Sequence, residues 1–128
     1  MVRYLTVMIG GAIGAGSRLF IGTLVARWYP ALFPLGTFAI NISGSFLIGV
    51  SLMFFLNRPS IDATWRLFLV TGILGGYTTF SSFEWEMFSA LRGGAIAAAM
   101  LYAMSSVFVG LVGVWIGAIL SNRLWPQG

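Results

Sequence analysis

Long apolar stretches separated by short polar segments set the pattern of this chain. Four stretches, at about residues 4–26, 34–56, 65–91 and 95–120, are each long enough to cross a membrane. A helix needs roughly 20 mostly apolar residues to span a bilayer core about 30 Å thick. Arginines and aromatic residues mark several ends of the stretches, which is typical of a membrane interface. The pattern predicts an all-α membrane protein whose four transmembrane helices form a single domain over residues 1–128.

The third stretch is interrupted by a run of poor helix formers. Its centre, residues 75–83, reads Gly-Gly-Tyr-Thr-Thr-Phe-Ser-Ser-Phe. Glycine and β-branched threonine lower helix stability, and serine and threonine hydroxyls offer the backbone hydrogen bonds that compete with a helix. The run predicts a broken helix, which a membrane tolerates only where the backbone faces protein or a water-filled cavity. A continuous helix that packs through its small residues is the alternative.

Polar and small residues recur every four positions in the second and fourth stretches. The positions are Thr37, Asn41, Ser45 and Gly49 in the second, and Tyr102, Ser106 and Gly110 in the fourth. This spacing places each set near one helix face. Such residues in a membrane span either line a functional route or bond and pack between helices. The glycines and Ser45 favour packing, whereas Asn41, Tyr102 and Ser106 leave both interpretations open.

Arg18 lies within the first stretch, where a charge is expensive. A guanidinium keeps its proton, so the side chain must snorkel to an interface, pair with a partner, or line an aqueous vestibule that attracts anions. We expect no other titratable group deep in the spans. Glu84 and Glu86 are two positions apart, so on a helix they point in different directions and form no carboxylate pair.

Composition supports this interpretation and excludes several classes of function. The chain is 59% hydrophobic and only 8% charged, whereas a soluble domain carries about 25% charged residues. The basic residues are dispersed arginines, which argues against nucleic-acid binding. Without histidine, cysteine or paired carboxylates, the sequence offers no support for an enzyme or a thiolate metal site. The apolar N-terminal run is expected to be a retained first helix and not a cleaved signal peptide.

The arginines also bear on membrane topology. With four spans, both ends of the chain and the middle loop share one side, and this side has four arginines against two on the other. They are Arg3, Arg58, Arg66 and Arg123 against Arg27 and Arg92. So weak a bias would let the chain insert in both orientations, and an antiparallel dimer would follow naturally. A chance fluctuation would give the same count.

Three motifs are specific enough to indicate a family. They are Gly10-Gly11-x-x-Gly14-Ala15-x-x-Arg18, Pro34-x-Gly36-Thr37-x-x-x-Asn41, and Gly72-x-x-Gly75-Gly76-x-Thr78-Thr79-Phe80-Ser81-Ser82-Phe83. With these motifs the sequence resembles the Fluc (CrcB-like) fluoride channels of bacteria along essentially its whole length. The third motif is the most specific. Ser82, where the family commonly has threonine, and Tyr77 depart from the pattern without removing a group on which the expectations depend.

The resemblance implies a fluoride-selective passive channel of the bacterial plasma (inner) membrane, which exports fluoride and confers fluoride resistance. It implies an antiparallel, dual-topology homodimer with two pores and a structural sodium ion at its centre, without an organic cofactor. It also implies roles for individual residues. The fluoride pathway would include Asn41, Phe80, Phe83, Ser106, Tyr102, Thr37, Thr79 and Ser81. The backbone carbonyls of Gly75 and Thr78 would hold the sodium ion. Attraction of anions in a vestibule by Arg18 remains the alternative to snorkelling that its chemistry alone offers.

Two other interpretations remain. A small dual-topology exporter of cationic drugs has the same size, but that class needs an embedded acidic residue in its first helix, where this chain has Arg18 and no acid. A non-transporting, holin-like assembly would not need polar stripes beside a broken helix. Without the resemblance, Phe80 and Phe83 would be interpreted as packing residues. The expected lack of titratable groups in the spans favours transport without proton coupling.

Overall fold

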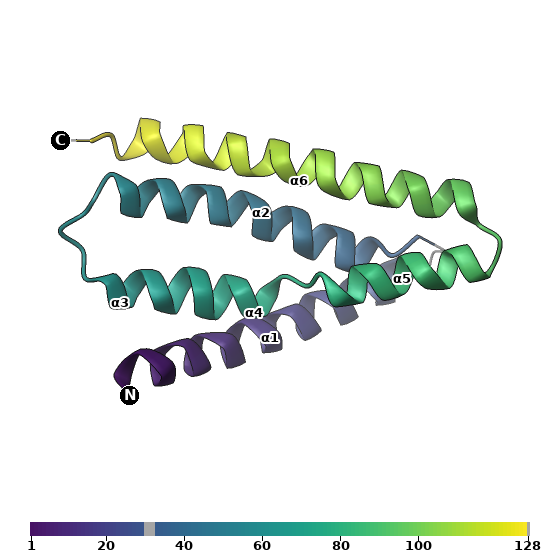
Figure 1. The fold of residues 1–128 in the computed structure, drawn as a ribbon, viewed down its shortest axis with the longest axis horizontal. Coiled ribbons are helices and arrows are strands. Elements are labelled where there is room, and N and C mark those ends of the chain that lie inside the picture. The colour runs from purple at the N-terminus through teal and green to yellow at the C-terminus, as the bar shows by residue number, and fades with distance from the viewer. Residues whose placement is uncertain (30–32, 128) are drawn as a thin grey trace.

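A computed structural model describes residues 1–29 and 33–127 of the chain as four helical passes lying side by side (Figure 1). The first, second and fourth passes are α1 (Val2–Trp28), α2 (Leu35–Leu56) and α6 (Ile96–Leu124). The third pass consists of α3 (Ala63–Arg66), η1 (Leu67–Leu74), α4 (Gly75–Tyr77) and α5 (Ser81–Arg92). Both ends of the chain lie at the same end of the bundle as the α2–α3 connection (Figure 1). The four passes agree with the four predicted spans to within a few residues at each end.

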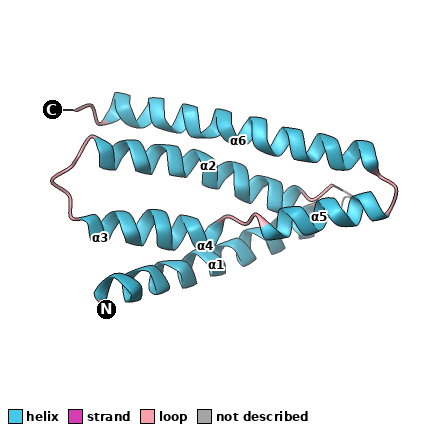
Figure 2. Cartoon of the chain, viewed as in Figure 1, coloured by secondary structure: helices cyan, strands magenta, loops and turns pink. Residues whose placement is uncertain are grey.

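The third pass is broken, as predicted, but over fewer residues than the sequence indicated. Helix α4 ends at Tyr77, Thr78 is extended with φ −75° and ψ 159°, and α5 begins at Ser81. The resulting loop in the middle of the pass is visible in Figure 2. Gly75 and Gly76 stay helical. The break is therefore confined to residues 78–80 and begins after the paired glycines.

Close packing against α1 explains the glycines before the break. A Cβ on Gly76 would lie 2.6 Å from the carbonyl oxygen of Gly11, and one on Gly72 would lie 2.9 Å from the Cα of Gly10. Only glycine allows two backbones to approach this closely. Gly72 lies within the π-helical turns of η1, and Gly76 lies in α4, which follows directly. The glycine-rich part of the first span is therefore a packing surface for the first half of the third.

Helices α2 and α6 pack through a second set of glycines. A Cβ on Gly49 would overlap the carbonyl oxygen of Val114, and a Cβ on Gly117 would overlap that of Phe46. These contacts confirm the interpretation of the glycines as packing residues.

The α2–α3 connection is hydrogen-bonded to the last turn of α6 and to the segment that follows it. Asn57, only 4% exposed, donates from Nδ2 to Oδ1 of Asn122 at 3.0 Å and to the carbonyl oxygen of Trp125 at 2.8 Å. Arg58 donates from Nη1 to the carbonyl oxygen of Pro126 at 2.8 Å. These three bonds hold two connecting segments together at one end of the bundle.

Asp62 caps α3 at the same end. Its Oδ1 accepts a hydrogen bond from the Thr64 backbone N–H at 2.7 Å. Hydrogen bonds from the side chain and backbone of Thr64 hold the pKa of Asp62 below its ordinary value. The third pass therefore begins with a side-chain cap.

Candidate functional site

Asn41 hydrogen-bonds to the backbone groups of Thr79 that have no helical partner at the break. Its Nδ2 donates to the carbonyl oxygen of Thr79 at 2.9 Å, and its Oδ1 accepts from the N–H of Thr79 at 2.9 Å. Backbone polar groups inside a membrane need such partners because water is absent. The two bonds use one Nδ2 hydrogen and leave the other available. Asn41 therefore fixes the position of the extended segment.

Arg18 reaches the same segment from α1. Its Nη1 donates to the carbonyl oxygen of Thr78 at 3.3 Å. It also lines a cavity of about 720 Å³ whose other polar wall residues include Thr37, Thr79, Ser82 and Glu86. Of the alternatives that the sequence left open, the structure shows pairing, and it places the pair at the edge of a partly polar cavity.

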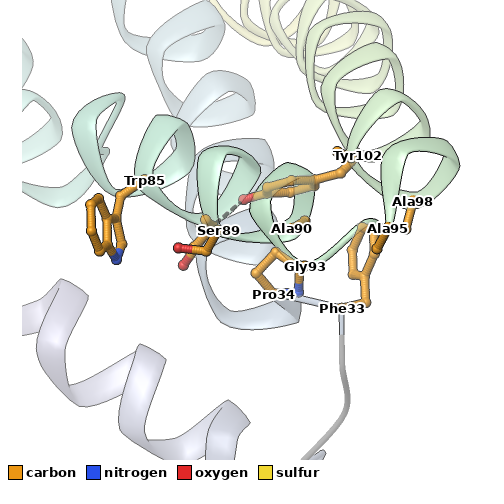
Figure 3. Close-up of a pocket in the computed structure, with 11 residues that line it drawn as sticks. Phe33, Pro34, Trp85, Ser89, Ala90, Gly93, Ala95, Ala98 and Tyr102 are labelled. Carbon is orange, nitrogen blue, oxygen red and sulfur yellow. Dashed lines mark hydrogen bonds between the residues drawn. The ribbon is translucent and has the colours of Figure 1, made fainter.

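Glu86, on α5, is a site residue that the sequence reasoning missed. Its Oε1 accepts a hydrogen bond from the Thr37 hydroxyl at 2.6 Å, and its Oε2 accepts one from the Tyr102 hydroxyl at 2.8 Å. Figure 3 shows Tyr102 reaching from α6 to this bond. The expectation that Arg18 is the one titratable group deep in the spans is therefore wrong. Glu86 lies three positions after Phe83, which puts both on one helix face, and this spacing is the signal that could have revealed it.

The two phenylalanines of the third pass lie in different surroundings. Phe83 is 9% exposed and packs edge-on against Tyr102, with ring centroids 5.0 Å apart and an interplanar angle of 64°. Phe80 belongs to the break and is 70% exposed on the single chain. The ring centroids of Phe80 and Phe83 are 5.9 Å apart. Phe83 is thus part of the packed site, and Phe80 extends it to the surface of the chain.

The remaining polar residues of the predicted pathway divide into two groups. The Thr79 hydroxyl donates to Oγ of Ser82 at 3.0 Å and accepts from the Ser82 N–H at 3.3 Å, which supports the first turn of α5. Ser81 begins that turn and is exposed. Ser106 lies one turn beyond Tyr102, and its buried Oγ has no hydrogen-bond partner among the described residues. The structure gathers Arg18, Thr37, Asn41, Thr78, Thr79, Phe83, Glu86 and Tyr102 around the break and the adjoining α5 turns.

The two carbonyls predicted to hold sodium have different partners. In a helix, the N–H of Thr79 would bond to the carbonyl of Gly75 four residues earlier. Here that N–H donates to Asn41 instead, so the Gly75 carbonyl loses its helical donor. Gly75 is exposed on the single chain. The Thr78 carbonyl accepts from Arg18 and keeps a second lone pair.

Fold and site together define a class of protein. Helices α1, α2 and α6 are each long and apolar enough to cross a membrane. The third pass, broken at its centre, contributes Thr78, Thr79 and Glu86 to the hydrogen bonds of the site. The chain is a multi-pass membrane protein.

Comparison with known proteins identifies the family. The family described as CrcB-like protein, Camphor Resistance (CrcB), matches residues 5–118, so the chain belongs to the CrcB-like family. A relative from Solibacter usitatus is 42% identical over 95% of this chain and 100% of its own. One from Thermus thermophilus is 44% identical over 97% of this chain and 98% of its own. Both relatives are named "Fluoride-specific ion channel FluC".

Proposed function

We propose that this chain is a fluoride-selective channel that lets fluoride leave the cell passively and so confers fluoride resistance. The observation that carries the proposal is the membrane-embedded break at residues 78–80, held by Asn41 and Arg18 beside Phe80 and Phe83. Relatives spanning nearly the whole chain are named as fluoride channels. The protein is an ion channel and not an enzyme.

The chemistry of the site suits a small, strongly hydrated anion. Such an ion must exchange water for hydrogen-bond donors and positive potential. The spare Nδ2 hydrogen of Asn41 and the unpartnered Ser106 hydroxyl are available donors. Arg18 supplies a permanent positive charge at the polar cavity. Aromatic rings carry a positive edge, which Phe80 and Phe83 can turn toward an anion.

Fluoride efflux from liposomes tests the proposal. The purified protein is reconstituted with internal potassium fluoride, a potassium ionophore is added, and a fluoride electrode records release. Rapid fluoride release with negligible chloride release is expected. Comparable chloride release, or no fluoride release from correctly folded protein, would contradict the proposal.

The variants Phe80→Ile and Phe83→Ile test whether these two rings line the pore or serve only in packing. Such apolar exchanges of similar volume usually destabilise a protein by less than about 1.5 kcal/mol. They remove the ring quadrupole, so fluoride flux should collapse while the protein still purifies folded. Normal flux through both variants would remove these rings from the pathway.

We further propose that two chains form an antiparallel homodimer with dual topology. The weak arginine bias allows both orientations. The exposure of Phe80 and Gly75 on a protomer leaves part of the site open to a second chain. Added arginines on one side should lock each orientation, and each locked form should be inactive alone and active when both are expressed together. Full activity of one locked form alone would exclude the antiparallel pair.

We also propose a structural sodium ion held by the carbonyl oxygens of Gly75 and Thr78 in both chains. An all-oxygen donor set suits a hard cation. Gly75 fits well because its carbonyl has lost its helical donor; Thr78 can contribute the lone pair that Arg18 leaves free. When bound, the ion would neutralise carbonyl dipoles in the membrane. Replacing sodium with a large organic cation should lower dimer stability, and unchanged stability after prolonged exchange would contradict the site.

Transport without proton coupling belongs to the same proposal, although Glu86 supplies a titratable group. Both carboxylate oxygens of Glu86 accept hydrogen bonds from hydroxyls. An exporter of cationic drugs is not favoured, since α1 contains no acidic residue. A fluoride gradient should therefore drive no proton movement in liposomes containing a pH-sensitive dye. Proton movement that Glu86→Gln abolishes would instead establish coupling.

A further inference from the structure

Phe33 continues the row of aromatic rings that begins at the break. It lies just before α2, and its ring centroid is 5.1 Å from that of Tyr102 at an interplanar angle of 76°. Tyr102 in turn packs edge-on against Phe83, 5.0 Å away, and Phe83 lies 5.9 Å from Phe80. Figure 3 shows Phe33 and Tyr102 entering one cavity from two different elements. Four rings from three parts of the chain therefore form one continuous row.

Phe33 lines two neighbouring cavities that differ in polarity. The cavity of about 720 Å³ is the more polar one, and Arg18 and Thr37 are among the residues that line it. The neighbouring cavity of about 540 Å³ is lined mainly by apolar residues such as Trp85 and Ala99, and it is the one drawn in Figure 3. Phe33, Pro34 and Glu86 line both cavities. Phe33 is therefore an aromatic side chain on the wall that the more polar and the less polar cavity share.

An anion passing from the larger cavity to the smaller one would leave the guanidinium of Arg18 and enter less polar surroundings, while staying beside the Glu86 carboxylate, which lines both cavities. Both effects oppose its passage because burial of an anion and repulsion between like charges are unfavourable. A ring edge offers positive potential without a titratable group or a tightly held counter-ion. The boundary thus requires the kind of group that Phe33 supplies.

We propose that Phe33 is a further pathway residue, whose ring edge stabilises fluoride where it passes between the more polar cavity, lined by Arg18, and the less polar one. This inference rests on the proposed fluoride-channel function. It extends the aromatic part of the fluoride pathway beyond Phe80 and Phe83. It also assigns part of the selectivity for fluoride over chloride to Phe33, just before α2.

Phe33→Leu tests the role of the ring, with Phe38→Leu as the matched control. Phe38 packs edge-on against Phe33 at 5.8 Å, but it lines a separate apolar cavity with Leu24 and Trp28. The Phe33 variant should reduce fluoride efflux at least about tenfold, which corresponds to about 1.4 kcal/mol in the barrier. The Phe38 variant should conduct like the unmodified protein. Phe33→Trp, which keeps an aromatic edge, should restore most of the flux.

Wild-type efflux and wild-type fluoride-to-chloride selectivity in folded Phe33→Leu would overturn the inference while leaving the channel function intact. Absence of fluoride efflux from the unmodified protein would instead overturn the proposed function. If the leucine variant does not fold, pentafluorophenylalanine at position 33 replaces it, because that ring keeps the shape and reverses the quadrupole. Slower fluoride efflux is then expected, and unchanged efflux would equally overturn the inference.

Discussion

The two halves of α2 share one spacing and have different roles. Thr37 and Asn41 in the first half are hydrogen-bonded to Glu86 and to the backbone of Thr79. Gly49 in the second half presses against the backbone of α6 at Val114. The four-residue period fixes which residues share a face. It does not fix what that face meets.

The partner helices account for the difference. The first half of α2 lies beside the broken pass, where backbone groups and a carboxylate need hydrogen-bond donors and acceptors. The second half lies along the continuous helix α6, whose backbone groups are already paired, so close approach is the main requirement. Ser45 lies at the transition: a Cβ on Gly110 would come 3.4 Å from its Oγ. Polar residues on a membrane helix therefore indicate a functional site where the neighbouring backbone is interrupted.

Substitution of Gly49 should have the largest effect on folding. In Gly49→Ala the added Cβ overlaps the Val114 carbonyl, so helices α2 and α6 must separate. Overpacking of this kind destabilises by about 1–3 kcal/mol. Thermal unfolding of the purified protein measures the loss. Gly16→Ala is the control, because a Cβ there meets nothing within 4 Å; equal destabilisation by both variants would remove the packing role of Gly49.

Asn41→Asp should leave the fold largely intact and nearly abolish conduction. The aspartate loses the donor to the Thr79 carbonyl and places a negative charge beside an anion route, where low polarity magnifies repulsion. We expect fluoride efflux to fall at least about 100-fold, equivalent to about 2.7 kcal/mol. Liposome efflux measures it, with size-exclusion chromatography as the folding check. Normal efflux would show that the Asn41 amide is dispensable.

Thr37→Val should have an intermediate effect. It keeps the shape and removes the hydroxyl that donates to Oε1 of Glu86, while the bond from Tyr102 remains. Loss of one such bond amounts to about 1 kcal/mol, so efflux should change about fivefold. Thr37→Ser keeps the hydroxyl and should behave like the unmodified protein. If serine and valine gave the same rate, the hydroxyl would have no part in conduction.

Ser45→Ala should have the smallest effect. Its side chain lies against Gly110, so the change removes one oxygen from a packing contact. Stability and efflux should both stay close to their original values, within about 0.5 kcal/mol. The same efflux and unfolding measurements apply. A loss of conduction comparable to that of Asn41→Asp would place Ser45 on the ion route and erase the difference between the two halves of α2.

The sequence predicted the features that depend on local chemistry. Apolar length gave the four passes, and the run of threonines and serines located the break, because both follow from propensity and hydropathy. The same reasoning placed the break too early. Gly75 and Gly76 have low helix propensity, yet packing of Gly76 on Gly11 keeps them helical. Packing between helices therefore outweighs helix propensity at Gly75 and Gly76, and this packing cannot be predicted from the neighbouring residues in the sequence.

The pairings within the site depend on which passes are neighbours. Asn41 needed partners at both ends of its amide, and both proved to be the backbone of Thr79, 38 positions away. Glu86 was considered only as a possible partner of Glu84, and its place in the site was missed because Thr37 and Tyr102, which bond to it, come from two other helices. The role of each residue in fluoride passage stays a prediction. For each of these residues the structure shows a specific contact that a substitution can remove to test its role.

The bonds at Asn57 have a consequence for biosynthesis. Trp125 and Pro126 are synthesised after all four passes, and they supply the acceptors for Asn57 and Arg58. Until then the Asn57 amide, almost fully covered in the finished protein, lacks its partners. Burying such an amide unpaired is unfavourable. The hydrogen bonds from Asn57 and Arg58 to these two carbonyls can therefore form only after the fourth pass has been synthesised, so they join this end of the bundle late in assembly.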